Sequence, residues 1–208
     1  MHMVKLKCFH GTSKVNAQAI INEQFFKNSS SNSLRLGEGA YFFNQMGSTS
    51  DYTIMCAREL LKHKYRNKQG PRDYCILSCI VECKDEQFMD LSDPDSMEFF
   101  HRMRYVMHER NLKHDPDFEY KNASVADTQV ILELKKEKTI AVIRAPQFFG
   151  MFEREQNMKF SDRKISQNPR TYVPNVINLC VDTYHARIRD IAIVEEGEFD
   201  VGHEGFAV

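Results

Sequence analysis

The twelve residues at 72–83, RDYCILSCIVEC, restrict the fold more than any other part of the sequence. They are rich in apolar and β-branched residues and contain no Gly or Pro, so they predict a strand long enough to cross a sheet. Cys75, Cys79 and Cys83 are four residues apart, and strand alternation places all three on one face. This spacing also raises a metal site as an alternative, but no CxxC pair or HxxxH partner completes a ligand set. We therefore expect the three thiols to behave as small apolar side chains.

Strand and helix patterns alternate on both sides of this segment. Alternating apolar and polar residues predict strands, and apolar residues three and four apart behind a capping Ser or Asp predict helices. These rules predict strands at 4–12, 40–43, 138–145, 176–182 and 187–196, and helices at 14–25, 51–65, 94–111 and 124–137.

The chain has 208 residues, which is enough for one full-sized core and short of the usual length for two. Three of the six prolines fall in residues 145–175, which show no sustained periodicity and predict a long loop. We therefore expect a single α+β domain over 1–208, with a helical insertion at 84–137 and the long loop at 145–175.

The charge of the chain is nearly balanced, with 28 Lys and Arg against 29 Asp and Glu. The chain has no overall excess of positive charge that would favour binding to nucleic acid or to an anionic membrane. A polyanion would therefore have to bind a local patch of basic residues. The six cysteines occur without a secretory h-region and without an apolar run of about 18 residues. These features predict a reduced, cytoplasmic protein with no membrane partner.

Two glycine motifs lie near expected strand ends, HGT at 10–12 and LGEGAYFF at 36–43. A glycine at position 11 lets a planar amide approach the backbone and pair with its N–H and C=O, because no side chain blocks the approach. The alternative is structural: HGT forms a strand-to-helix turn, Gly37 and Gly39 shape a second turn, and Tyr41 fills the core. Taken alone, neither motif separates the two interpretations.

Together, the order and spacing of the motifs resemble the ADP-ribosyltransferases of the poly(ADP-ribose) polymerase type, also called the diphtheria-toxin-like class. That family carries HG followed by Ser or Thr on its first strand. Further along come G-x-G-x-Y-F and a second tyrosine preceded by a small hydroxyl residue. The likeness covers 4–60 closely and 74–83 loosely, returns at the C-terminal strands, and does not extend to 84–170. The matching residues are His10, Gly11, Thr12, Gly37, Gly39, Tyr41, Phe42, Thr49 and Tyr52.

The resemblance implies a split β-sheet core with flanking helices and a site for NAD, used as a substrate. It implies that Tyr41 and Tyr52 sandwich the nicotinamide ring, an arrangement in which each aromatic contact contributes about 0.5 to 1.5 kcal/mol beyond burial. It also implies that Gly11 pairs with the carboxamide, Thr49 bonds it through a hydroxyl, and His10 holds a ribose hydroxyl. The implied NAD-binding set is His10, Gly11, Thr12, Gly39, Tyr41, Thr49 and Tyr52.

The sequence departs from the family at one position. Family members place a Glu on a late strand, where it binds the 2'-hydroxyl of the nicotinamide ribose, and Asn178 falls there when 175–194 is laid on that strand pair. An amide orients a hydroxyl without the formal charge that stabilises an oxocarbenium-like state. The implied catalytic set is therefore His10, Tyr41 and Asn178. The alternative is that a carboxylate elsewhere in the chain supplies the charge. The candidates are Glu153, Glu155, Glu195 and Glu196. The structural interpretation is that all four are ordinary solvated surface residues.

The resemblance implies a mono-ADP-ribosyltransferase that moves one ADP-ribose from NAD to a macromolecular acceptor and releases nicotinamide. Family habit also implies an intracellular toxin or antiviral effector, with an antitoxin as a partner. The acceptor is a protein or a nucleic acid, either RNA or DNA. Basic residues at 66–72, with Arg163, Lys164 and Arg170, are candidates for touching phosphate, although charged loops are usually only solvated. Two alternatives stay open: a non-catalytic module that binds NAD or ADP-ribose, and the RNA 2'-phosphotransferase branch of the superfold.

Overall fold

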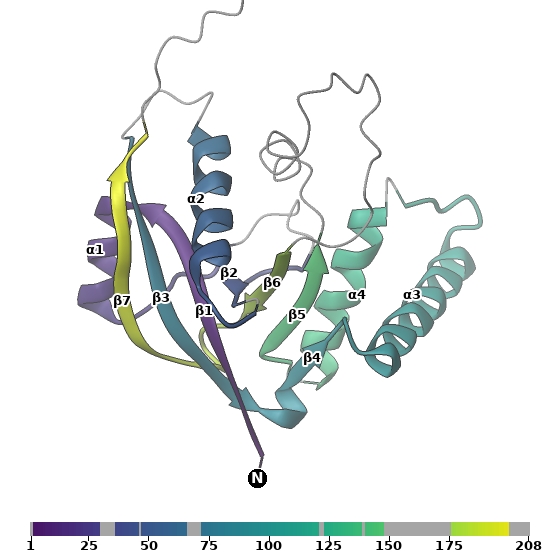
Figure 1. Cartoon of the computed structure of the whole chain (residues 1–208). Helices are drawn as coiled ribbons and strands as arrows, with labels where there is room; N and C mark the ends of the chain where they lie inside the picture. Colours follow the sequence, from purple (N-terminus) through teal and green to yellow (C-terminus); the bar gives the residue numbers. More distant parts are fainter. Residues whose placement is uncertain are drawn as a thin grey trace, which may run out of the picture.

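The computed structural model describes residues 2–29, 36–45, 47–65, 72–120, 123–138, 140–147 and 176–199. Within these ranges the chain forms one mixed sheet of seven strands with four α-helices around it, which agrees with the expected α+β class (Figure 1). None of the described helices has both the length and the apolar character needed to cross a membrane.

Apart from a short 3-10 turn and a three-residue strand, the elements follow one another in the order that the sequence patterns predict. They are β1 (Met3–Ser13), α1 (Lys14–Glu23), β2 (Ala40–Asn44), α2 (Asp51–Tyr65), β3 (Asp73–Lys84), a 3-10 turn η1 (Asp85–Gln87), β4 (Phe88–Asp90), α3 (Pro94–His114), α4 (Ala123–Lys138), β5 (Val142–Gln147), β6 (Val176–Val181) and β7 (Arg187–Glu198).

Side-chain caps explain where two of the helices begin. The Ser13 hydroxyl accepts a hydrogen bond from the Asn16 amide at 3.3 Å, and the Asp93 carboxylate accepts one from the Ser96 amide at 2.9 Å. Each bond satisfies one backbone donor that has no partner within its helix. The start predicted for α1 from Ser13 is therefore confirmed.

Two predicted boundaries are wrong. The helical segment expected at 84–137 also contains the three-residue strand β4, which pairs in parallel with β5. The loop expected at 145–175 begins too early, because β5 continues through Gln147 and pairs there with Val176 of β6. The rest of that expected loop, 148–175, lies outside the described residues.

The strands are ordered β4-β5-β6-β2-β1-β3-β7, and every neighbouring pair except β4–β5 is antiparallel. The junction between β2 and β1 is short: only Cys8 with Asn44 and Phe9 with Phe43 stand in register. By contrast, β1 pairs with β3 from Met3 to Ser13. The junction therefore divides the sheet into a block of four strands and a block of three.

The two faces of the sheet carry separate cores. One face packs against α1 and contains the odd-numbered residues of β3, so the prediction that Cys75, Cys79 and Cys83 share a buried face is confirmed. Burial raises the pKa of the Cys79 thiol to about 12, so this thiol stays protonated and apolar. The other face is covered by two groups of helices: α2 packs over Phe9 and Phe43, while α3 and α4 pack over β5 and the Cys180 side of β6.

The turn between β6 and β7 shows that the sheet is strongly curved. Three strands separate β6 from β7 in the sheet, which corresponds to roughly 19 Å if the sheet were flat. Only residues 182–186 join them, and this link is tightly turned, because the Ala186 amide donates to the Asp182 carbonyl at 3.0 Å. Figure 1 shows β7 bending towards β6 at its start. The curvature wraps the sheet around the α1 core.

Candidate functional site

The segment before β2 is held in a closed turn by its own tyrosine. The Tyr41 hydroxyl donates to the Gly37 carbonyl at 2.8 Å and accepts from the Leu36 amide at 3.1 Å. Burial raises the pKa of Tyr41 far above its ordinary value, so the phenol stays neutral and keeps both bonds. Its side chain belongs to the face covered by α3 and α4. The turn therefore fixes the position of the Tyr41 ring on that face.

Gly39 is a glycine because β6 passes directly beside it. A Cβ on this residue would lie 2.6 Å from the Cys180 sulfur and 2.8 Å from the Val181 carbonyl oxygen. The contact belongs to the ladder in which Ala40 faces Val181. Close approach of two backbones is a sufficient reason for this glycine of the motif.

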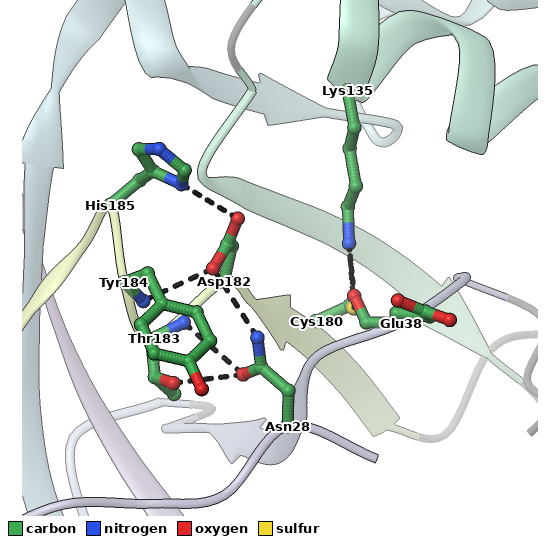
Figure 2. A network of polar contacts seen from close by, with 8 residues as sticks. All are labelled: Asn28, Glu38, Lys135, Cys180, Asp182, Thr183, Tyr184 and His185. Carbon is green, nitrogen blue, oxygen red and sulfur yellow. Dashed lines mark hydrogen bonds and ion pairs between the residues drawn. The ribbon is translucent and has the colours of Figure 1, made fainter. Parts of the chain in front are cut away.

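Figure 2 shows how both sides of this contact are anchored. The Lys135 ammonium of α4 donates to the Glu38 carbonyl and lies 3.4 Å from the Cys180 sulfur. After β6, the Asp182 carboxylate accepts from His185 Nδ1 at 2.8 Å and from Asn28 at 3.3 Å. These bonds tie β6 to α4 and to the segment after α1, so its register against β2 is firmly set.

His10 lies on the opposite face of the sheet from Tyr41 and Asn178, so the structure does not bring its side chain together with theirs. Its Nδ1 is 2.8 Å from the Tyr41 carbonyl oxygen, which accepts only if that nitrogen carries the proton. The ring packs against Phe26 and Phe42, with centroids 5.3 and 5.5 Å away, in the α1 core. Burial lowers the pKa of His10, so the ring is neutral at pH 7. Its predicted role towards a ribose hydroxyl therefore stays a prediction.

Gly11 is crowded by α2. A Cβ here would lie 2.7 Å from Leu61 Cδ1 and 2.9 Å from the Ala57 carbonyl oxygen. Close packing of the helix on β1 therefore accounts for this glycine without a ligand, and its predicted role towards a carboxamide stays a prediction. Thr12, the third residue of the motif, is buried with 8% of its surface exposed.

The second tyrosine lies at the start of α2, where the sequence predicts it. Tyr52 is half-buried and packs with the Phe43 core, whereas Thr49 is exposed just before the helix. A shallow hollow lies beside it, lined mainly by Tyr52, Thr53, Cys56, Phe43, Asn44 and Val176. It encloses almost no space, whereas typical ligand sites enclose about 300 to 1,000 Å³, so these residues form no enclosed ligand pocket.

Asn178 lies on the same face as the two tyrosines. It stands opposite Phe43 in the β2–β6 ladder, and Tyr41 stands opposite Cys180, so Asn178 and Tyr41 are diagonal neighbours. Its side chain is 7% exposed, and its Nδ2 donates to Gln147 Oε1 at 2.6 Å. The structure thus places Tyr41, Tyr52 and Asn178 on one side of the sheet, with Tyr41 in the cluster under α3 and α4 and Tyr52 in the cluster under α2.

The alternative carboxylates on β7 are engaged elsewhere. Glu195 accepts from Arg58 at 3.2 Å and from the Tyr74 hydroxyl at 2.9 Å, and Glu196 pairs with Lys14 at 3.4 Å. Their strand lies at the far edge of the sheet, next to β3 and away from β6. The other two candidates, Glu153 and Glu155, fall outside the described residues.

Sequence reasoning missed Gln147. The residue fell in the segment assigned to the long loop, and Pro146 before it hides the end of the strand. The only local signal is that an apolar strand runs straight into Pro-Gln. Its partner on β6 is distant in the sequence.

No model of a protein family matches the chain, and no curated protein or solved structure matches it either. Any function assigned to the chain therefore rests on the motifs and on the geometry of the described residues.

Proposed function

We propose that this chain is a mono-ADP-ribosyltransferase that moves ADP-ribose from NAD to a macromolecular acceptor and releases nicotinamide. The observation that carries the proposal is that Tyr41, Tyr52 and Asn178 all lie on one side of the sheet. Asn178 lies far from the two tyrosines in the sequence, and the motifs hold no information on the sheet register. Their placement on one side supports a common site.

The proposal includes an ADP-ribosyltransferase-like split sheet. The short β1–β2 junction supports it, because only two residue pairs join the block β4-β5-β6-β2 to the block β1-β3-β7. His10 spans this junction through its bond to the Tyr41 carbonyl, so its imidazole links the two blocks next to the proposed site.

In the proposed reaction, the bond between the ribose C1' and the nicotinamide nitrogen breaks, and its electron pair leaves with nicotinamide. The acceptor's lone pair forms a new bond to C1' and the acceptor loses a proton. Tyr41 and Tyr52 stack on the ring, and the Asn178 amide orients the 2'-hydroxyl while positive charge develops on the ribose. Because Asn178 is neutral, it offers less stabilisation of that charge than a carboxylate. This agrees with the transfer of a single unit.

A tyrosine pair tests the site. Tyr52→Ala removes one stacking ring, while Tyr184→Ala removes a tyrosine that is 75% exposed and lies in the β6–β7 turn. We expect Tyr52→Ala to abolish nicotinamide release from NAD and Tyr184→Ala to match the wild type. Equal turnover in both variants, each shown to be folded by circular dichroism, would contradict the sandwich.

The acceptor is identified by labelling a lysate with NAD that carries a label on its adenylate, then treating it with nuclease or protease. Loss of label with nuclease indicates a nucleic acid, and loss with protease indicates a protein. Labelling in a cytoplasmic extract, and its suppression by a co-expressed neighbouring protein, would support the proposal of an intracellular toxin or effector held by an antitoxin.

The second candidate is a non-catalytic module that binds NAD or ADP-ribose. The replacement of the family's carboxylate by Asn178, with Glu195 and Glu196 engaged at the far edge of the sheet, favours it. This candidate requires saturable NAD binding in calorimetry without any release of nicotinamide. Turnover by the wild-type protein would exclude it.

A further inference from the structure

The orientation of the Asn178 side-chain amide is coupled to that of Gln147 on β5. Its Nδ2 donates to Gln147 Oε1 at 2.6 Å, and the residue is almost fully buried. The register explains the contact: Ala145 faces Asn178 and Gln147 faces Val176, so Gln147 is the diagonal neighbour of Asn178 on the same face of the sheet. This short bond in a buried place couples the two amides, because turning Asn178 alone would set its oxygen against the Gln147 oxygen, and a bond returns only if both amides turn together.

The two ends of an amide have opposite polarity, so its orientation decides its chemistry. With the nitrogen turned towards β5, the carbonyl oxygen Oδ1 is the end that remains for the face shared with Tyr41 and Phe43. An oxygen accepts from a ribose hydroxyl and turns the negative end of a dipole towards developing positive charge. A nitrogen in the same place would do the reverse.

We infer that Gln147 is a positioning residue that makes Asn178 an acceptor, and so lets a neutral amide stand in for the family's carboxylate. The inference rests on the proposed function, because it names how one group of that site is oriented. Gln147 acts through Asn178 and not on the ribose itself.

Two substitutions at Gln147 separate orientation from packing. Gln147→Glu keeps an acceptor towards Asn178 Nδ2, whereas Gln147→Lys supplies a donor, which binds Oδ1 and turns the nitrogen to the site. We expect Gln147→Lys to lower the kcat for nicotinamide release about ten- to a hundredfold with little change in KM, the scale of a misplaced reacting group. Gln147→Glu should lower this kcat clearly less than Gln147→Lys does. Gln18→Lys, on the exposed surface of α1, controls for the added charge.

A double-mutant cycle tests whether the effect passes through Asn178. In an Asn178→Ala background, Gln147→Lys should cause no further loss, because there is no amide left to turn. Equal kcat in Gln147→Lys and the wild type, or an undiminished loss in the Asn178→Ala background, would overturn the inference.

A nuclear magnetic resonance measurement keeps the inference separate from the proposed function. The side-chain amide protons of Asn178 should exchange slowly in the wild type and quickly in Gln147→Leu. If this difference is seen but the wild type neither binds nor cleaves NAD, the proposed function fails and the contact stands. If the wild type cleaves NAD and the amide protons of both proteins exchange alike, the positioning role fails and the proposed function stands.

Discussion

Replacing Gly39 with Ala should destabilise the protein far more than replacing a glycine of the next loop. The added methyl would lie 2.6 Å from the Cys180 sulfur and 2.8 Å from the Val181 carbonyl oxygen. The oxygen belongs to the ladder between β2 and β6 and cannot swing aside as a flexible side chain would. Ordinary contact begins at 3.4 Å, so the added methyl is about 0.6 Å too close to the oxygen and about 0.8 Å too close to the sulfur, and the two strands must separate.

Inserting one methyl into a packed region costs typically about 1 to 3 kcal/mol, and a contact with backbone places Gly39→Ala near the upper end, about 3 kcal/mol. For a chain of this size that corresponds to a fall in Tm of roughly 6 to 12 °C. Gly47→Ala is the matched control. Gly47 has a φ of +73° but no atom within 4 Å of an added Cβ, so only backbone strain of about 1 kcal/mol opposes it.

Urea denaturation followed by circular dichroism measures the free energy of unfolding for both variants. A second comparison uses Cys180→Ala, which removes the sulfur and should recover part of the loss in the Gly39→Ala background. A difference of about 0.5 kcal/mol is within the usual scatter of such measurements. If the free energies of unfolding of Gly39→Ala and Gly47→Ala differ by no more than this, the close approach of β6 does not explain why residue 39 is a glycine.

The same contacts lead us to expect three further outcomes. Tyr41→Phe should cost about 1 to 3 kcal/mol in urea denaturation, because the Leu36 amide loses its acceptor, and an unchanged midpoint would contradict the closed turn. Since folding lowers the pKa of His10, the unfolded chain binds more protons below its ordinary value of about 6.5, so stability should fall as pH drops from 7 to 5. His10→Gln should flatten that part of the profile, and an equal slope in both proteins would argue against a buried neutral ring. Asn28→Ala should lower stability by about 1 to 3 kcal/mol, because the amide and hydroxyl of Thr183 lose their acceptor, and a loss below about 0.5 kcal/mol would show that this link is dispensable.

Elements whose cause is local could be predicted from the sequence. The helix at 51–65 has helical periodicity behind Asp51, and the structure reproduces its predicted bounds. The strand β4 has only three residues, too few for a period, and it exists because β5 lies beside it. The end of β5 was missed for a similar reason, since Gln147 is strand only because β6 pairs with it.

The same contrast between local sequence signals and long-range pairing applies to the candidate site. Motif spacing singled out Tyr41 and Tyr52, and laying 175–194 on the family's late strand pair singled out Asn178. The face they share depends on the β2–β6 register, which no short stretch of sequence contains. Strand alternation likewise predicts that His10 and Gly11 point to opposite faces without saying which helix covers each one. Only the packing shows that α2 covers Gly11 and that His10 lies in the α1 core.

The position of β6 also governs when the chain is able to fold. Residues 176–181 are made after β2 and β5, yet they form the strand that lies between those two. Until they leave the ribosome, each of those strands has an open edge, and β3 also lacks its outer partner β7. Such edges pair readily with other chains, and closing a sheet from distant segments is slow. The nascent protein should therefore depend on chaperones until its last strands emerge, and fragments that end before β6 should aggregate rather than fold.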